Sequence, residues 1–169
     1  MSDLADWDKQ YLRQAISLAG AAVDSGKRPF GAVIVDDRGA VISAGCSTQQ
    51  DDRDWTAHAE MNVLRAAGRR LSWDELAKCT LYASSDPCPM CAGALYWSNV
   101  RRLVFGLNEM AMRPFRRDDP RIMGLSMTSR EVLNRSPRPI EVIGPALIDE
   151  AIEPYRRLLQ RPRPTEGWT

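Results

Sequence analysis

The only histidine of the chain, His58, lies in the segment Thr-Ala-His-Ala-Glu, two residues before Glu60. Thirty residues after this histidine, the segment Asp-Pro-Cys-Pro-Met-Cys carries Cys88 and Cys91. Imidazole and thiolate groups are common zinc ligands, and a catalytic zinc site has three protein ligands and one position open for water. The pKa of water in that position falls to about 7. The pattern predicts a hydrolytic zinc centre held by His58, Cys88 and Cys91.

Glu60 is the expected proton carrier of this centre. Two residues after His58 on a helix, its side chain points in another direction, which suits contact with the bound water better than a place among the ligands. We expect Glu60 to take a proton from the water and to pass protons to the ring nitrogen and the departing amine. The backbone N–H of Cys88, at a predicted helix start, is expected to stabilise negative charge on the oxygen. The order His-x-Glu, then Pro-Cys-x-x-Cys, is the signature of zinc deaminases.

A structural zinc site is the alternative, and it would normally need a fourth cysteine or histidine. Cys46 and Cys79 are the only candidates, and both lie in predicted strands. Four cysteines in a chain of this length do not suggest a disulfide framework.

The elements that must position these residues alternate between helices and strands. Apolar periodicity and turn residues predict longer helices over about 4–23, 58–67, 89–97 and 149–159, the last one interrupted or kinked at Pro154. Strands are predicted over 30–35, 40–46, 79–83, 102–107 and 140–143. The first helix is expected to bury a stripe of Leu4, Trp7, Tyr11, Ala15, Leu18 and Ala22. Thr56 is expected to cap the helix that follows it, and residues 49–54 to form a polar loop. Ser72 with Glu75, and Thr128 with Glu131, resemble capping boxes of short helices. This alternation predicts a three-layer α/β/α domain.

Length and composition favour one domain. The chain has 169 residues, 44% of them hydrophobic, with a formal net charge of +1. We expect a single domain over residues 1–159, an irregular arginine-rich insert over 108–127 and a proline-rich tail over 160–169. No apolar run is long enough for a membrane span, and the polar N-terminal segment does not resemble a signal peptide. A cytoplasmic protein is therefore expected.

The chain resembles the cytidine deaminase-like superfamily, in its branch of guanine deaminases and tRNA adenosine deaminases. The resemblance rests on Pro29-Phe-Gly-Ala-Val33, Thr56-Ala-His-Ala-Glu60, Pro87-Cys-Pro-Met-Cys-Ala-Gly-Ala94 and Val104-Phe-Gly106, and it fades after Leu107. Pro29-Phe30-Gly31 and Leu95-Tyr96-Trp97 are most similar to bacterial guanine deaminases. The resemblance implies a five-stranded mixed sheet between helices, one zinc ion per subunit, and a homodimer with active sites near the interface.

The same resemblance implies a set of substrate contacts. Phe30 and Trp97 are expected to wall an aromatic base, although both also fit a plain core. Ser47 occupies the place of an asparagine with which the family hydrogen-bonds its substrate, and Asp86 replaces the family's frequent glutamate before Pro-Cys. Asp119, in the pair Asp118-Asp119, can accept hydrogen bonds from a base or belong to a solvated turn. Ala59 completes the expected contacts, with Trp168 from the partner subunit's tail unless that tail is disordered.

The sequence thus predicts zinc-dependent hydrolytic deamination of a free amino-substituted heterocycle, through attack by zinc hydroxide. Guanine is the first expected substrate, followed closely by isocytosine, cytosine, modified guanines and triazines. A tRNA-specific adenosine deaminase is the first alternative, supported by the arginine cluster of Arg156, Arg157, Arg161 and Arg163, which also fits a solvated helix end. A non-catalytic subunit with a structural zinc ion is the second alternative. No membrane partner is expected, and nucleic acid is not favoured as a partner.

Overall fold

The computed structural model describes residues 4–115 and 125–161. Its strands form one five-stranded sheet in the order β2-β1-β3-β4-β5. The strands are β1 (Gly31–Val35), β2 (Val41–Cys46), β3 (Thr80–Ser85), β4 (Arg102–Leu107) and β5 (Glu141–Ile143). β1 pairs antiparallel with both β2 and β3, whereas β3, β4 and β5 run parallel. The prediction of a five-stranded mixed sheet is confirmed.

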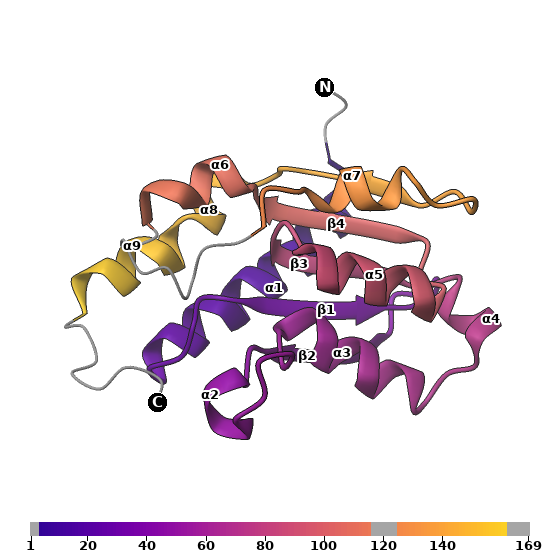
Figure 1. The fold of residues 1–169 in the computed structure, drawn as a ribbon, viewed down its shortest axis with the longest axis horizontal. Helices are drawn as coiled ribbons and strands as arrows, with labels where there is room; N and C mark the ends of the chain where they lie inside the picture. Colours follow the sequence, from indigo (N-terminus) through magenta and orange to yellow (C-terminus); the bar gives the residue numbers. More distant parts are fainter. Residues whose placement is uncertain (1–3, 116–124, 162–169) are drawn as a thin grey trace.

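Helices cover both faces of the sheet (Figure 1). The longer helices are α1 (Asp6–Asp24), α3 (Ala59–Gly68), α5 (Pro89–Ser98) and α9 (Glu153–Gln160). The shorter ones are α2 (Gln49–Asp52), α4 (Trp73–Leu76), α6 (Glu109–Met112), the 3-10 helix η1 (Arg113–Phe115), α7 (Ser129–Leu133) and α8 (Ile148–Ala151). Within residues 4–115 and 125–161, no helix has the length and apolar character needed to cross a membrane.

Alternate side chains of the central strands enter two separate cores, as the two-residue period of a strand requires. Ala32 and Ile34 of β1 pack with residues of α3, α5 and α7 on one face. Val33 and Val35 pack with residues of α1, α8 and α9 on the other face. The predicted three-layer α/β/α architecture is therefore confirmed.

Gly31, at the start of β1, allows α1 to pack directly on the sheet. A Cβ atom at this position would lie 2.3 Å from the backbone oxygen of Ala15 and 2.7 Å from the backbone nitrogen of Ala19. Both obstacles are helix backbone, which no rotamer change can move away. The start of β1 therefore packs directly against α1, at the position where Gly31 pairs with Cys46, the last residue of β2.

A buried ion pair ties α1 to the middle of the sheet. The carboxylate of Asp8, only 2% exposed, accepts hydrogen bonds from both terminal nitrogens of Arg102, at 2.6 and 2.8 Å. It also accepts one from the hydroxyl of the fully buried Tyr82, at 2.7 Å. Arg102 further donates to Glu141 at 2.7 Å and lies 5.0 Å from the ring centroid of Trp7.

Several local predictions are wrong in detail. Thr56 does not cap α3, because His58 is the N-cap residue and makes no side-chain cap, while the Thr56 hydroxyl bonds Asp54. The expected polar loop over 49–54 contains the helical turn α2, and the start of the expected irregular insert forms α6 and η1. The last helix is interrupted as predicted, but at Ile152 between α8 and α9, so that Pro154 lies in the first turn of α9. Both predicted capping boxes are present.

Candidate metal centre and active site

His58 stands at the N-terminus of α3, in the extended conformation that an N-cap residue adopts. A turn leads the chain into it, with the Ala57 N–H donating to the carbonyl of Asp54 at 3.0 Å and the His58 N–H to that of Thr56 at 2.8 Å. The helix begins immediately, because the His58 carbonyl accepts from the N–H of Asn62 at 2.9 Å. The imidazole is therefore carried by the junction of a turn and a helix.

Cys88 is the N-cap residue of α5, as His58 is of α3. Pro89 follows at the first helical position, where its fixed φ favours the helix and its missing N–H costs nothing. The Cys88 carbonyl accepts from the N–H of Ala92 at 2.9 Å, so Cys91 lies in the first turn with its sulfur on the same side as that of Cys88. The partial positive charge of the helix start favours the thiolate forms of both residues.

The three side chains converge on one point. His58 Nδ1 lies 3.6 Å from Cys88 Sγ and 3.5 Å from Cys91 Sγ, and the two sulfurs are 3.7 Å apart. With Zn–S near 2.3 Å and Zn–N near 2.0 Å, a tetrahedral ion would hold two sulfurs about 3.8 Å apart, and sulfur and nitrogen about 3.5 Å apart. The ligand atoms thus already have the spacing that one tetrahedral zinc ion requires.

Neither of the other cysteines joins this group, which is the one cluster of three or more potential ligands found in residues 4–115 and 125–161. Cys79 is buried, and its sulfur lies 3.6 Å from the backbone oxygen of Glu75. Cys46 ends β2 outside the cluster. The described donor set therefore leaves one position open, as a catalytic site does.

Glu60 lies in the first turn of α3 and is only 5% exposed. Its Oε2 is 3.5 Å from Cys91 Sγ, so the carboxylate borders the ligand group. Burial raises its pKa, since an apolar environment disfavours the charged form. A raised pKa makes the carboxylate a better proton acceptor, as the role of proton carrier requires.

The ligands are electrostatically coupled. The pKa of Cys88 is lowered to about 4, chiefly by its hydrogen bond with Cys91 and also by the one with His58. The Cys91 pKa is raised by its hydrogen bond to Cys88 and by burial. Burial lowers the pKa of His58, but its hydrogen bond to Cys88 and the charge of Glu60 outweigh burial and raise it.

The family model of the cytidine and deoxycytidylate deaminase zinc-binding region matches residues 5–107, which include all four of these residues. The chain belongs to this deaminase family. A probable cytosine deaminase of Schizosaccharomyces pombe is 40% identical over 156 residues, which are 92% of this chain and 94% of the relative. A tRNA-specific adenosine deaminase of Haemophilus influenzae is 39% identical over 105 residues, 62% of this chain and 61% of that protein.

Solved structures agree with this assignment. The guanine deaminase of Nitrosomonas europaea superposes with a TM-score of 0.74 and 27% identity, over 91% of this chain and 84% of that one. The protein is thus a hydrolytic deaminase with a zinc-binding domain, in which His58, Cys88 and Cys91 are positioned as a zinc site. A non-catalytic zinc subunit is not supported.

The other predicted site residues of the deaminase lie in different surroundings. Phe30 is half-buried just before β1, where its ring meets that of Tyr155 edge to face at 6.1 Å. Ala59 is fully buried in the first turn of α3. Trp97 is 75% exposed near the end of α5, so the alternative that it belongs to the core is wrong. Asp86 is half-buried, and burial raises its pKa. The substrate contacts of these residues stay predictions.

Other predicted positions lie outside the described residues. These are Asp118, Asp119, Arg163, Trp168 and residues 116–124 of the arginine-rich insert. The predicted tail over 160–169 is described only at its first two residues.

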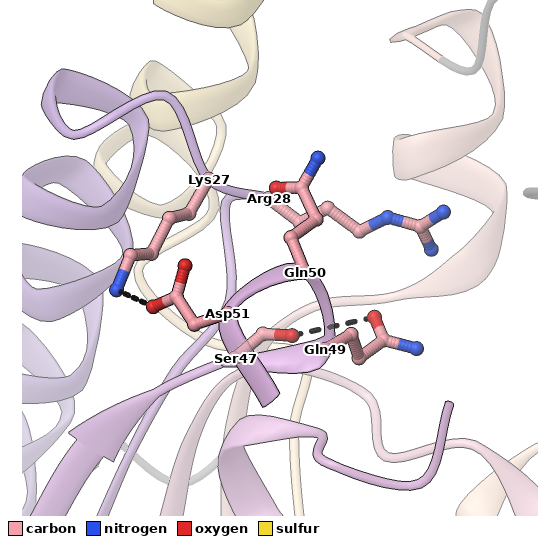
Figure 2. A pocket seen from close by; sticks show the side chains of 6 residues that line it. All are labelled: Lys27, Arg28, Ser47, Gln49, Gln50 and Asp51. Atoms are coloured by element: carbon pink, nitrogen blue, oxygen red, sulfur yellow. Dashed lines mark hydrogen bonds and ion pairs between the residues drawn. The ribbon is translucent and has the colours of Figure 1, made fainter. Parts of the chain in front are cut away.

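The loop between β2 and α3 contains a residue that sequence reasoning missed (Figure 2). Ser47 is buried, and its hydroxyl lies 3.3 Å from both Gln49 Oε1 and the carbonyl oxygen of Ala57. Gln49 itself is 5% exposed and donates from Nε2 to the carbonyl of Trp55 at 2.9 Å. A glutamine in a polar stretch gives no signal of burial, and only its place in the fold reveals its role.

Proposed function

We propose that this deaminase hydrolyses the C–NH2 bond of a free, amino-substituted nucleobase. In the overall reaction, the oxygen of water bonds to the ring carbon, the C–N bond breaks and the amine leaves as ammonia. The observation that carries the proposal is the tetrahedral spacing of the His58, Cys88 and Cys91 ligand atoms, with the buried carboxylate of Glu60 at their edge.

The residues of the chain divide the work. His58, Cys88 and Cys91 would hold the zinc ion, which supplies a Lewis acid that lowers the pKa of water to about 7. The Glu60 carboxylate accepts a proton from water and delivers it to the ring nitrogen, and a second transfer converts the amine into ammonia. Because Glu60 is buried, bulk water is a poor substitute for this shuttle. The backbone N–H of Cys88 stabilises the charge that develops on oxygen.

Cytosine is the base that we place first. The Schizosaccharomyces pombe relative matches almost the whole chain, including the part after Leu107, where the resemblance to guanine deaminases fades. Segments after the catalytic helices are where related enzymes change their substrates, since loops carry specificity on a common scaffold. Guanine, the first choice from sequence, is the second candidate, supported by the structural similarity to the Nitrosomonas europaea enzyme.

The arginine cluster gives less support to a tRNA substrate than the sequence suggested, because its described members are paired with carboxylates. Arg157 and Arg161 both pair with Asp24, and Arg156 pairs with Glu153. These ion pairs reduce the positive charge that the cluster presents to a polyanion. A tRNA-binding protein would lose affinity steeply with salt.

We also propose a homodimer. α5 carries apolar residues on nearly all sides, yet Met90 and Trp97 on its outer face are exposed. A helix that is apolar all round is normally buried, so a second copy would cover this face. Light scattering should give about twice the chain mass of 19.0 kDa, and a monomer at working concentrations would contradict this proposal.

The test of the proposed function is ammonia release by the zinc-loaded protein from cytosine, guanine, isocytosine, their nucleosides and tRNA. Turnover of a free base supports the proposal, while turnover of tRNA alone overturns it. The matched control is Glu60→Gln, which keeps the size of the side chain but cannot accept the proton. We expect it to bind zinc normally and to lose at least about 100-fold in kcat.

A further inference from the structure

The β2–α3 loop is held by hydrogen bonds that converge on the residues just before His58. The Gln49 carboxamide donates to the carbonyl of Trp55 at 2.9 Å and accepts from the hydroxyl of Ser47 at 3.3 Å. The carbonyl of Ala57 lies 3.0 Å from the N–H of Thr48 and 3.3 Å from the Ser47 hydroxyl. One buried side chain therefore links the end of β2 to the turn that carries the imidazole.

A second tie joins the same loop to α3. Asn62, one turn after His58, donates from Nδ2 to the carbonyl of Cys46 at 3.0 Å and to the Thr48 hydroxyl at 2.9 Å. The entry of α3 is thus braced from two sides, by Asn62 within the helix and by Gln49 ahead of it. Removal of the Gln49 carboxamide would break its hydrogen bonds to Trp55 and Ser47 and leave the turn held to this loop by the contacts of Ser47 and Thr48 with the Ala57 carbonyl.

We propose that Gln49 is a positioning residue for the metal ligand His58. The inference rests on the proposed function, since it assumes that His58 holds zinc. His58 is an N-cap residue, so the hydrogen bonds of α3 fix the chain after it, and the turn over residues 54–57 fixes the chain before it. Gln49 supplies a side-chain donor to the carbonyl of Trp55, within that turn, at 2.9 Å.

A small displacement of the His58 imidazole would weaken zinc binding. The spacing of 3.5 to 3.6 Å between His58 Nδ1 and the two sulfurs leaves little tolerance for displacement of the imidazole. Groups behind metal ligands that orient them typically change metal affinity or activity by about 10- to 100-fold when they are removed. Gln49 acts one step further back, on the backbone that carries the ligand, and we expect the lower half of that range.

Gln50, drawn beside Gln49 in Figure 2, provides a matched control position. Gln50 is the next residue of α2, has the same side chain and is exposed, whereas Gln49 is buried. The substitutions Gln49→Leu and Gln50→Leu therefore make the same chemical change at adjacent positions of one helical turn. Only the first removes a donor and an acceptor from the loop before His58.

The alternative role for this loop is direct contact with the substrate, as the sequence predicts for Ser47. A substrate contact and a positioning residue differ in what they affect. Loss of a substrate contact raises KM and leaves metal binding unchanged. Loss of a positioning residue weakens metal binding even with no substrate present.

The experiment measures the zinc dissociation constant of the intact chain by competition with a chromophoric chelator, and the ligand-field spectrum of the cobalt-substituted protein. We expect Gln49→Leu to weaken zinc about 10- to 30-fold and to change the cobalt spectrum, with Gln50→Leu equal to wild type. Ser47→Ala is a smaller change that keeps the hydrogen bond between Gln49 and Trp55, and it should weaken zinc binding about threefold. This variant replaces Gln49→Leu in the test if Gln49→Leu does not fold.

Specific results would overturn the inference. Zinc affinity of Gln49→Leu within twofold of the Gln50→Leu control, with an unchanged cobalt spectrum, would show that Gln49 does not position the ligand. Unchanged zinc affinity in Ser47→Ala together with a raised KM would assign the loop to the substrate instead. A wild-type protein that binds one zinc ion but deaminates no free base would refute the proposed function and leave the test of Gln49 intact.

Discussion

The buried ion pair of Asp8 with Arg102 yields the sharpest stability prediction. Asp8 is 2% exposed and accepts three hydrogen bonds, two from Arg102 and one from Tyr82. Asp8→Ala leaves the guanidinium and the buried Tyr82 hydroxyl without this acceptor. Breaking a buried pair by removing one partner typically costs about 3 to 5 kcal/mol.

The surroundings place the expected cost near the lower end of that range. Arg102 keeps its hydrogen bond to Glu141 and its contact with Trp7, so it is not left uncompensated. We expect Asp8→Ala to lower the free energy of unfolding by about 3 kcal/mol. For a chain of this size, that loss corresponds to a fall in Tm of roughly 6 to 12 °C.

Asp6→Ala is the control for this measurement, because it removes the same side chain two residues earlier on α1. Asp6 is almost fully exposed. Among the described residues its one ion pair is with Lys9, at 3.2 Å. Exposed pairs contribute about 0 to 1 kcal/mol. Calorimetry or urea unfolding of the zinc-loaded proteins decides the matter. If Asp8→Ala melts within 2 °C of Asp6→Ala, the reasoning about the buried pair is refuted.

Three further predictions follow from other sites. Chelation of zinc should lower Tm by roughly 5 to 11 °C, relative to protein in free zinc at about 100 times the dissociation constant. Added zinc should restore the original Tm. An unchanged Tm after chelation would contradict a metal centre that joins α3 to α5. Ser72→Ala removes the capping box at α4 and should lower the free energy of unfolding by about 1 kcal/mol, measured by urea unfolding, whereas no loss would show that the box contributes nothing. Burial raises the pKa of the Cys79 thiol to about 11, so it stays protonated at pH 8 and becomes reactive only as the pH approaches 11. Mass spectrometry after iodoacetamide treatment should find Cys79 unmodified at pH 8, and its rapid alkylation there would contradict the burial.

The catalytic constellation could be predicted because its signal is local. His58 with Glu60, and Cys88 with Cys91, lie within single turns, and the proline after Cys88 marks a helix start. Zinc chemistry then links the two segments across thirty residues without knowledge of the fold. The mixed five-stranded sheet was predicted from the resemblance to a known family rather than from periodicity, and the order of its strands was not predicted.

Features that depend on contacts between distant segments were not visible in the sequence. The first helix was predicted, but with Trp7 in its buried stripe, whereas the structure buries Leu12 and Ile16 and leaves Trp7 half exposed. α1 is apolar over much of its surface, so more than one stripe fits its periodicity. Asp8 in turn looks like an ordinary exposed acid until the fold places Arg102, 94 residues away, against it.

The loop before α3 shows how the catalytic and selective parts of the deaminase can separate. The hydroxyl of Ser47 and the carboxamide of Gln49 are engaged with Ala57 and Trp55, so in this conformation they brace the path to His58. A residue whose polar atoms are already paired offers little discrimination between bases, because specificity arises when a wrong substrate leaves a buried polar group unpaired. Ser47→Asn is then expected to disturb the turn rather than to add a substrate contact. Selection between cytosine and guanine would accordingly depend on other positions, with Phe30 and the segment after Leu107 as the first to exchange between relatives.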